Sequence, residues 1–348
     1  MRNSTAASMA EVLMPIWRRL LNRPSIGVEE DFFDLGGDRE MAAKLFSEIA
    51  QICGRDISPE TILHAPTVAS LGALLEKAEP LRLPRVAQLK GGADGPPVFI
   101  IPGLGGTLLD LVQLARQVET PHAIFGLVAR GVDGQEDPFG RVEDMAPFYR
   151  DAIRKLQTRG PYFLIGNSFG GLVAMEMARH LAECGERIGL LCMLDTYPHT
   201  RHLSLLQRAG VVLRKTRHHA AALTKMPIRG GASYIGRRLK SRLPGSGNRR
   251  MRVLERQAGE YVSPVMMRVR ANDDLALERY HPRFYSGKVK YVKAQDGWYF
   301  PFDAAAVWDK LVKDLEVETV PGDHLGMTVT HYENLARVLS RYLHEGMK

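Results

Sequence analysis

Short apolar runs alternate with amphipathic segments over most of the chain after residue 97. The segments between them carry apolar residues at helical spacing, as in 145–157 and 171–184. Strands that alternate with helices in this way predict βα units and a mainly parallel sheet. The runs are VFII (98–101), AIFGLV (123–128), YFLIG (162–166), IGLLCML (188–194), KVKYVKA (288–294) and LEVETV (315–320).

The first 79 residues show a different pattern, in which amphipathic segments follow one another without strands. Apolar side chains recur at helical spacing in 8–22, in 39–52 and after Pro66. Three helices in so short a stretch predict a small bundle. Residues 80–96 are rich in proline and glycine and are expected to form a linker, with VAQLK inside it as a first edge strand.

Length and composition indicate a globular protein of two domains, 1–79 and 97–348. The chain has 348 residues, with 45% hydrophobic and 25% charged residues, which excludes a disordered or fibrous protein. No apolar run is long enough for a membrane span, and the N-terminus lacks the pattern of a secretory signal. Three scattered cysteines, without a C-x-x-C pair, argue against a disulfide framework and a zinc site. We therefore expect a cytoplasmic protein without a metal site.

The net charge of +8 comes from one segment. Fifteen of the 47 Lys and Arg residues lie between His199 and Arg256, where the one acid is Glu255. This segment lies within a helical insertion, about 199–286, that interrupts the strand–helix alternation. Three interpretations stay open: a solvated surface, a landing site for an acidic carrier protein, and contact with an anionic membrane. Nucleic acid is disfavoured because the segment lacks interleaved aromatic residues.

The strongest chemical motif is GNSFG (166–170), which fits G-x-S-x-G. It follows the apolar run YFLIG and opens a helical segment, so the motif has the strand–turn–helix context that a nucleophile elbow requires. The flanking glycines permit a tight turn that lifts the Ser168 hydroxyl above the sheet. Ser168 is therefore the candidate nucleophile.

A serine nucleophile needs a base and an orienting acid, which follow it in the chain at the ends of later strands. Asp195 ends the next apolar run, in LDTYP, and His324 follows the last run, in PGDHLGM. We predict a triad of Ser168, Asp195 and His324. Asp296, which follows KVKYVKA, is the alternative acid.

Acyl transfer also requires donors that stabilise the oxyanion. The backbone N–H of Phe169 lies directly after the nucleophile, and the loop PGLGG follows the first run of the sheet. In that loop Gly103 is the first candidate and Leu104 the second. No phosphate loop is expected, since no G-K-[ST] follows.

With these residues identified, residues from about 84 to 348 resemble the thioesterase domains that terminate nonribosomal peptide and polyketide synthases. The matching motifs are GNSFGG, LDTYP and GDH, in that order. The resemblance implies an α/β-hydrolase fold, an acyl-enzyme on Ser168, His324 as general base with Asp195 as its partner, and a helical lid at about 199–286. Asn167 departs slightly from the family's usual residue before the serine.

Residues 8–78 resemble the phosphopantetheine carrier domains of the same systems, through VEEDFFDLGGD and LHAPTVASLGALL. In that family a serine directly after GGD or GGH receives the phosphopantetheine arm. Here Arg39 occupies that position, and neither Asp38 nor Glu40 supplies a hydroxyl. We therefore expect a carrier-like domain that cannot be loaded and serves for docking or structure.

The sequence thus predicts a thioesterase that acts on an acyl or peptidyl group from a separate carrier protein or coenzyme A, without a cofactor. Two alternatives stay open: an acyltransferase or cyclase with the same triad, and a non-catalytic docking or scaffold protein.

Overall fold

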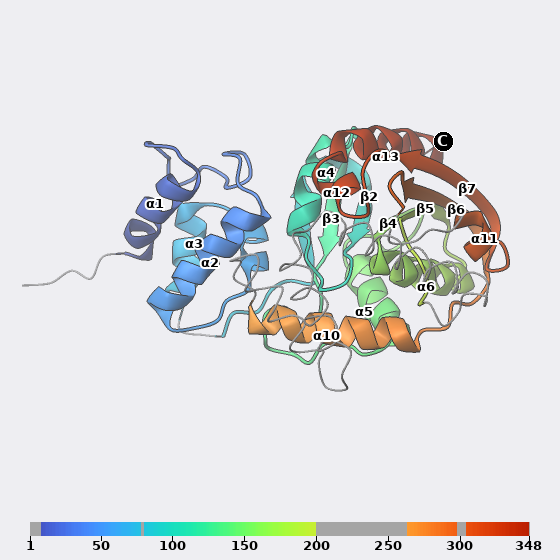
Figure 1. The fold of residues 1–348 in the computed structure, drawn as a ribbon, viewed down its shortest axis with the longest axis horizontal. Coiled ribbons are helices and arrows are strands. Elements are labelled where there is room, and N and C mark those ends of the chain that lie inside the picture. The colour runs from blue at the N-terminus through green and yellow to red at the C-terminus, as the bar shows by residue number, and fades with distance from the viewer. Residues whose placement is uncertain (1–7, 78–79, 200–262, 298–303, 348) are drawn as a thin grey trace, which may run out of the picture.

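The computed structural model describes residues 8–77, 80–199, 263–297 and 304–347 (Figure 1). Within these ranges no helix is both long and apolar enough to cross a membrane. The basic segment between His199 and Arg256, and most of the predicted lid, lie outside the described residues.

The N-terminal unit is a helical bundle with well-capped helices. Ser8 and Glu11 form a capping box at the start of α1, and the Asp38 side chain accepts a hydrogen bond from Met41 N at the start of α2. Trp17 and Phe32 meet edge to face in its core, with ring centroids 5.2 Å apart. The elements are α1 (Met9–Leu20), α2 (Arg39–Cys53), the 3₁₀ helix η1 (Pro59–Leu63) and α3 (Val68–Leu75).

The rest of the described chain is built on a seven-stranded sheet of order β1-β3-β2-β4-β5-β6-β7. The edge strand β1 runs antiparallel to β3, and every other neighbouring pair is parallel. The predicted runs are therefore confirmed as strands of one mainly parallel sheet. The strands are β1 (Val86–Lys90), β2 (Ala93–Ile101), β3 (His122–Leu127), β4 (Tyr162–Asn167), β5 (Ile188–Leu194), β6 (Tyr285–Ala294) and β7 (Val312–Val320).

Helices cover both faces of this sheet. Alternate residues of a strand point to opposite faces, so one buried strand contributes to two cores. In β2, Val98 and Ile100 join a core with α4 and α13, whereas Phe99 and Ile101 join a core with α5 and α6. The first core continues into the N-terminal bundle. The helices are η2 (Leu109–Leu111), α4 (Val112–Gln117), α5 (Val142–Arg154), α6 (Phe169–Glu183), α10 (Pro264–Arg279), α11 (Ala304–Trp308), α12 (Gly326–Val329) and α13 (Tyr332–Gly346).

Two predicted boundaries differ from the structure. VAQLK forms the edge strand β1, as predicted, with Ala87 and Leu89 buried beside β3. The expected linker 80–96 differs at its end, because β2 already begins at Ala93. Its prolines and glycines therefore lie partly within strands. The predicted lid 199–286 overlaps β6, which begins at Tyr285, and its described part is the helix α10 with short flanks.

Candidate active site

Ser168 stands at a sharp turn between β4 and α6. Its backbone has φ 52° and ψ −118°, a conformation that residues with a side chain rarely adopt. Such a conformation costs on the order of 1–3 kcal/mol and persists where surrounding contacts enforce it. Here Ser168 N donates to Leu194 O (2.8 Å), and the Thr196 hydroxyl donates to Ser168 O (2.9 Å). The turn is thus held from β5, and it projects Ser168 at the carboxyl end of the sheet.

The glycines of the motif are required by close backbone approach. A Cβ on Gly166 would lie 2.4 Å from Gly170 O, and one on Gly170 would lie 2.3 Å from Pro102 O. A Cβ on Gly171 would lie 2.0 Å from the Thr196 hydroxyl oxygen. A side chain at Gly166 would push β4 and the start of α6 apart, and one at Gly170 or Gly171 would push the elbow away from the residues that follow β2 and β5.

The predicted acid and base are in hydrogen-bond contact. Nδ1 of His324 lies 2.7 Å from Oδ2 of Asp195, across the ends of β7 and β5. Asp195 is 4% exposed and is itself held in place, because its N–H donates to Val292 O and its Oδ1 accepts from Ala294 N. A carboxylate that accepts from Nδ1 favours the tautomer of the imidazole in which Nε2 can accept a proton.

The other acids near this edge have different surroundings. Asp296, the alternative triad acid, is exposed, and its backbone N–H donates to Gly322 O. The carboxylate of Asp323 accepts from Gly326 N (2.7 Å) at the start of α12. In the structure the acid that contacts His324 Nδ1 is therefore Asp195.

The candidate oxyanion donors lie beside the nucleophile. A Cβ on Gly103 would stand 3.5 Å from the Cβ of Ser168, so the loop after β2 and the elbow are in contact. Phe169 is the first residue of α6, and the N–H of a first helical residue has no acceptor within its own helix. Leu104, the second candidate in the loop, is half-buried. The roles of these three residues stay predictions.

Two side chains of α10, which the sequence pattern did not single out, hold this loop. Asp273 accepts from Gly105 N (2.8 Å), and Arg270 donates to Leu104 O (3.3 Å). Asp273 is 5% exposed, and burial raises its pKa to about 7. Neither residue belongs to a motif, and the loop and helix lie far apart in the sequence, so spacing offers no signal for this contact.

A third missed residue is Glu176, a buried acid on α6. Its carboxylate accepts hydrogen bonds from the guanidinium of Arg179 (2.8 Å), from the Tyr280 hydroxyl (3.1 Å) and from the guanidinium of Arg283. It also lies 3.3 Å from Nε2 of His180. Burial alone would raise the pKa of Glu176, but the guanidinium groups of Arg179 and Arg283 outweigh burial and lower this pKa. The cluster ties the elbow helix to the segment after α10.

We expect Glu176→Gln to lower the free energy of unfolding at pH 7 by about 3 kcal/mol, since breaking a buried ion pair leaves its partners uncompensated. Because the folded pKa of Glu176 lies below its unfolded value of about 4.5, this stability is present above that pH and disappears in more acidic solution. Urea unfolding at pH 7 and at acidic pH measures the difference.

The matched control is Glu183→Gln, which removes the other carboxylate that contacts Arg179. Glu183 is 58% exposed, so its loss should cost less than about 1 kcal/mol. Equal destabilisation by the two variants would contradict the role given to the buried cluster.

Arg39, which the sequence predicts at the position of the carrier domains' attachment serine, begins α2 and faces the α/β body. Its guanidinium lies 3.5 Å from the carboxylate of Asp110 in η2, and its side chain is about half exposed. Arg39 thus takes part in a contact between the two units.

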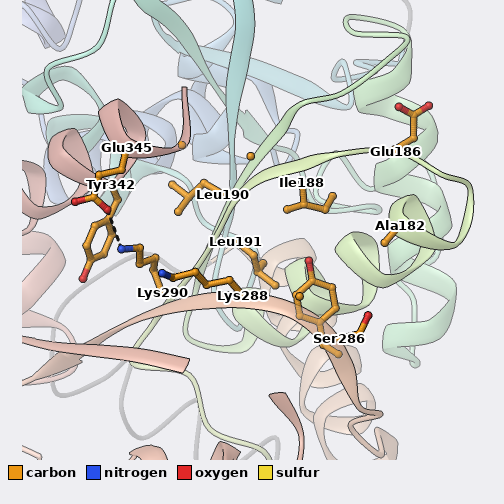
Figure 2. Close-up of a pocket in the computed structure, with 14 residues that line it drawn as sticks. Ala182, Glu186, Ile188, Leu190, Leu191, Ser286, Lys288, Lys290, Tyr342 and Glu345 are labelled. Atoms are coloured by element: carbon orange, nitrogen blue, oxygen red, sulfur yellow. Dashed lines mark hydrogen bonds and ion pairs between the residues drawn. The ribbon is translucent and has the colours of Figure 1, made fainter. Parts of the chain in front are cut away.

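A hollow of about 420 Å³ opens at the opposite edge of the sheet, where β5 and β6 begin (Figure 2). Its lining includes Ile188, Lys288, Lys290 and Glu345. Lys290 contacts Glu345 (2.8 Å), as Figure 2 shows, and it also contacts Glu316. Because Ser168 and His324 follow the carboxyl ends of their strands, this hollow does not belong to the candidate site.

Known families match both units of the chain. The family described as "Thioesterase domain" matches residues 96–343, and "Phosphopantetheine attachment site" matches residues 11–75. The dimodular nonribosomal peptide synthase of Bacillus subtilis (strain 168) is 37% identical over 189 residues, which are 54% of this chain. The chain covers 8% of the length of that protein.

Solved structures share the fold. The four-domain nonribosomal peptide synthetase holo-AB3403, bound to AMP and glycine, has a TM-score of 0.61 at 23% identity, over 98% of this chain and 27% of that one. The NocB thioesterase domain, in covalent complex with a fluorophosphonate nocardicin G analogue, has a TM-score of 0.50 at 22% identity, over 72% and 96%. The predicted fold class, an α/β-hydrolase preceded by a helical carrier-like unit, is confirmed.

Proposed function

Since this chain belongs to the thioesterase domain family, we propose that it releases acyl or peptidyl groups from a thioester through a triad of Ser168, His324 and Asp195. The observation that carries the proposal is the 2.7 Å contact between His324 Nδ1 and Asp195, at the same sheet edge as the strained Ser168. The relatives are nonribosomal peptide synthetases, which supports a place in the biosynthesis of such products.

The first half of the proposed reaction forms an acyl-enzyme. His324 Nε2 takes the proton of Ser168 Oγ while Oγ attacks the thioester carbonyl, and a C–O bond forms. The tetrahedral intermediate then collapses, the C–S bond breaks, and the departing sulfur takes the proton from His324. Asp195 stabilises the imidazolium between these two steps.

The second half repeats the sequence with water. His324 takes a proton from the water that attacks the acyl-serine, and returns it to Oγ as the free acid leaves. In both halves the negative charge develops on the carbonyl oxygen. We expect the N–H groups of Phe169 and of Gly103 or Leu104 to stabilise it, and each such donor typically contributes about 3 kcal/mol in the transition state.

The substrate should arrive on a separate carrier protein or as an acyl-coenzyme A, because Arg39 supplies no hydroxyl for a phosphopantetheine arm. The carrier-like unit would then serve in docking or structure. This proposal follows from the residue at position 39 and from its contact with Asp110.

We expect the wild-type chain to gain no mass on incubation with a phosphopantetheinyl transferase and coenzyme A. The control is Arg39→Ser, which supplies a hydroxyl directly after GGD. This variant should gain the mass of one phosphopantetheine arm. Intact-protein mass spectrometry distinguishes the two chains. A phosphopantetheine adduct on the wild type would overturn the expectation.

The activity is tested with a panel of acyl thioesters on coenzyme A and on a carrier protein. We expect release of the thiol and the free acid, together with labelling of the enzyme by a fluorophosphonate probe. Products with an amine or hydroxyl acceptor in place of the acid would instead identify an acyltransferase or cyclase. If no donor is consumed and no label is incorporated, the chain is a docking protein.

A further inference from the structure

A carboxylate of the carrier-like unit reaches the loop that holds the candidate oxyanion donors. Glu60, in η1, accepts from the Thr107 hydroxyl (2.6 Å) through Oε1 and from Leu108 N (3.0 Å) through Oε2. Glu60 is 2% exposed and Leu108 is fully buried. These two hydrogen bonds hold the C-terminal end of the loop 102–108, which begins directly after β2.

The same loop is held in its middle by α10. Asp273 accepts from Gly105 N, and Arg270 donates to Leu104 O. Gly105 and Gly106 both have positive φ (92° and 72°), which glycine adopts readily and most other residues do not. Within the loop, Gly106 N donates to Gly103 O (3.1 Å), and the contacts with Asp273 and Arg270 hold the loop from outside.

The carrier-like unit is docked by further contacts around Glu60. Arg116 in α4 lies 3.1 Å from Asp31 and also pairs with Asp34. The Ser263 hydroxyl, at the start of α10, donates to Asp56 (3.0 Å). In Figure 1, α10 extends from beside the N-terminal unit along the α/β body. The docked unit thus touches both the oxyanion loop and the helix that holds it.

We propose that the carrier-like unit acts as a fixed part of the thioesterase, in which Glu60 is a positioning residue for the oxyanion loop. This inference rests on the proposed function of that loop. The residue is not expected to touch the substrate. It acts by holding Thr107 and Leu108, and through them the backbone donors at Gly103 and Leu104.

The burial of Glu60 supports a specific role for this carboxyl group. Burial raises its pKa to about 7, against the hydrogen bonds from Thr107 and Leu108 and the nearby charge of Arg39, while Asp110 raises it further. Burying a carboxyl group is unfavourable unless its hydrogen bonds are satisfied. The two bonds to the loop satisfy Glu60, and Glu60 in turn satisfies the buried Leu108 N–H.

The test compares Glu60→Ala, Glu60→Gln and the interface control Arg116→Ala. A small displacement of catalytic groups can cost up to a hundredfold in rate. We expect Glu60→Ala to lower kcat about 10- to 100-fold, per fluorophosphonate-reactive site, with little change in KM. Glu60→Gln keeps one acceptor oxygen for Leu108 N, and the Thr107 hydroxyl can accept from the amide N–H, so this variant should recover most of kcat. Arg116→Ala weakens docking away from the loop and should stay within about threefold of the wild type.

Hydrogen exchange of the peptide that spans 103–111 supplies a readout that does not depend on activity. We expect faster exchange at Thr107 and Leu108 in Glu60→Ala but wild-type exchange in Arg116→Ala. If Glu60→Ala keeps the wild-type kcat or exchange, Glu60 does not position the loop. If Arg116→Ala loses as much kcat as Glu60→Ala, docking in general is responsible and the proposal is overturned.

The failure of the proposed function would look different. In that case the wild-type chain would hydrolyse no thioester and take up no fluorophosphonate. The exchange rates of the loop in the three variants would still decide whether Glu60 holds it.

Discussion

Ser168→Ala should lower the rate of acyl release by about a millionfold, the loss known for removal of a serine nucleophile in a hydrolase of the same mechanism. Without Oγ no acyl-enzyme forms, and the remaining donors can only polarise the carbonyl. Alanine keeps the Cβ, so the strain at φ 52° and the contacts of the elbow should be unchanged.

The loss is measured as free acid released from an acyl thioester, and intact-protein mass should show the acyl adduct on the wild type alone. Ser340→Ala is the control. It removes a half-buried serine hydroxyl on α13 that donates to Ala336 O and accepts from Glu119 N, with no contact to the elbow. Acyl release by Ser168→Ala at the wild-type rate would refute the assignment of the nucleophile.

Asp195→Asn should have the second largest effect, a decrease in kcat of about ten-thousandfold. The carboxylate accepts from His324 Nδ1 over 2.7 Å and so fixes the tautomer in which Nε2 can take the serine proton. An asparagine can present its amide N–H to Nδ1, which would favour the wrong tautomer. It also removes the negative charge that stabilises the imidazolium.

The matched control is Asp296→Asn, at the other acid considered for this role. Because Asp296 is exposed and Asp195 is buried beside the histidine, we expect Asp296→Asn to retain kcat within about twofold. The kcat of each variant is measured with the same thioester. It is compared with the wild-type kcat, for which the active fraction is counted by fluorophosphonate labelling. A larger loss in Asp296→Asn would reverse the choice of acid.

The local pattern of the sequence was enough to predict the strands and the elbow. A parallel strand buried on both faces is a nearly continuous apolar run, and the predicted runs in β2, β4 and β5 have this character. The runs in β6 and β7 alternate with charged residues, and they too form strands of the sheet. The elbow could be located because the strand, the glycines and the helix of the motif are consecutive in the sequence, and Gly166 is required by its contact with Gly170 and Gly171. The end of the expected linker could not be predicted from composition. Gly95 and Pro96 are residues typical of turns, yet they lie within β2.

Spacing favoured Asp195 as the acid but left Asp296 open as the alternative, since each follows a strand that ends at the same edge. The difference arises from the path of each chain after its strand. Asp195, at φ 41°, is held by Val292 and Ala294 of the neighbouring strand, which direct its carboxylate inward to His324. Asp296 remains at the surface.

The sequence alone determined the strand–helix order and the candidate residues Ser168, Asp195 and His324, and it predicted that Arg39 stands where carrier domains have the attachment serine, because each is encoded by neighbouring residues. The tertiary structure alone decided between Asp195 and the alternative Asp296 as the acid that contacts His324, and it brought Glu60 and Asp273 to the loop after β2. These contacts join segments far apart in the chain. Their geometry depends on how the two units and α10 pack together, for which a local pattern of residues carries no signal.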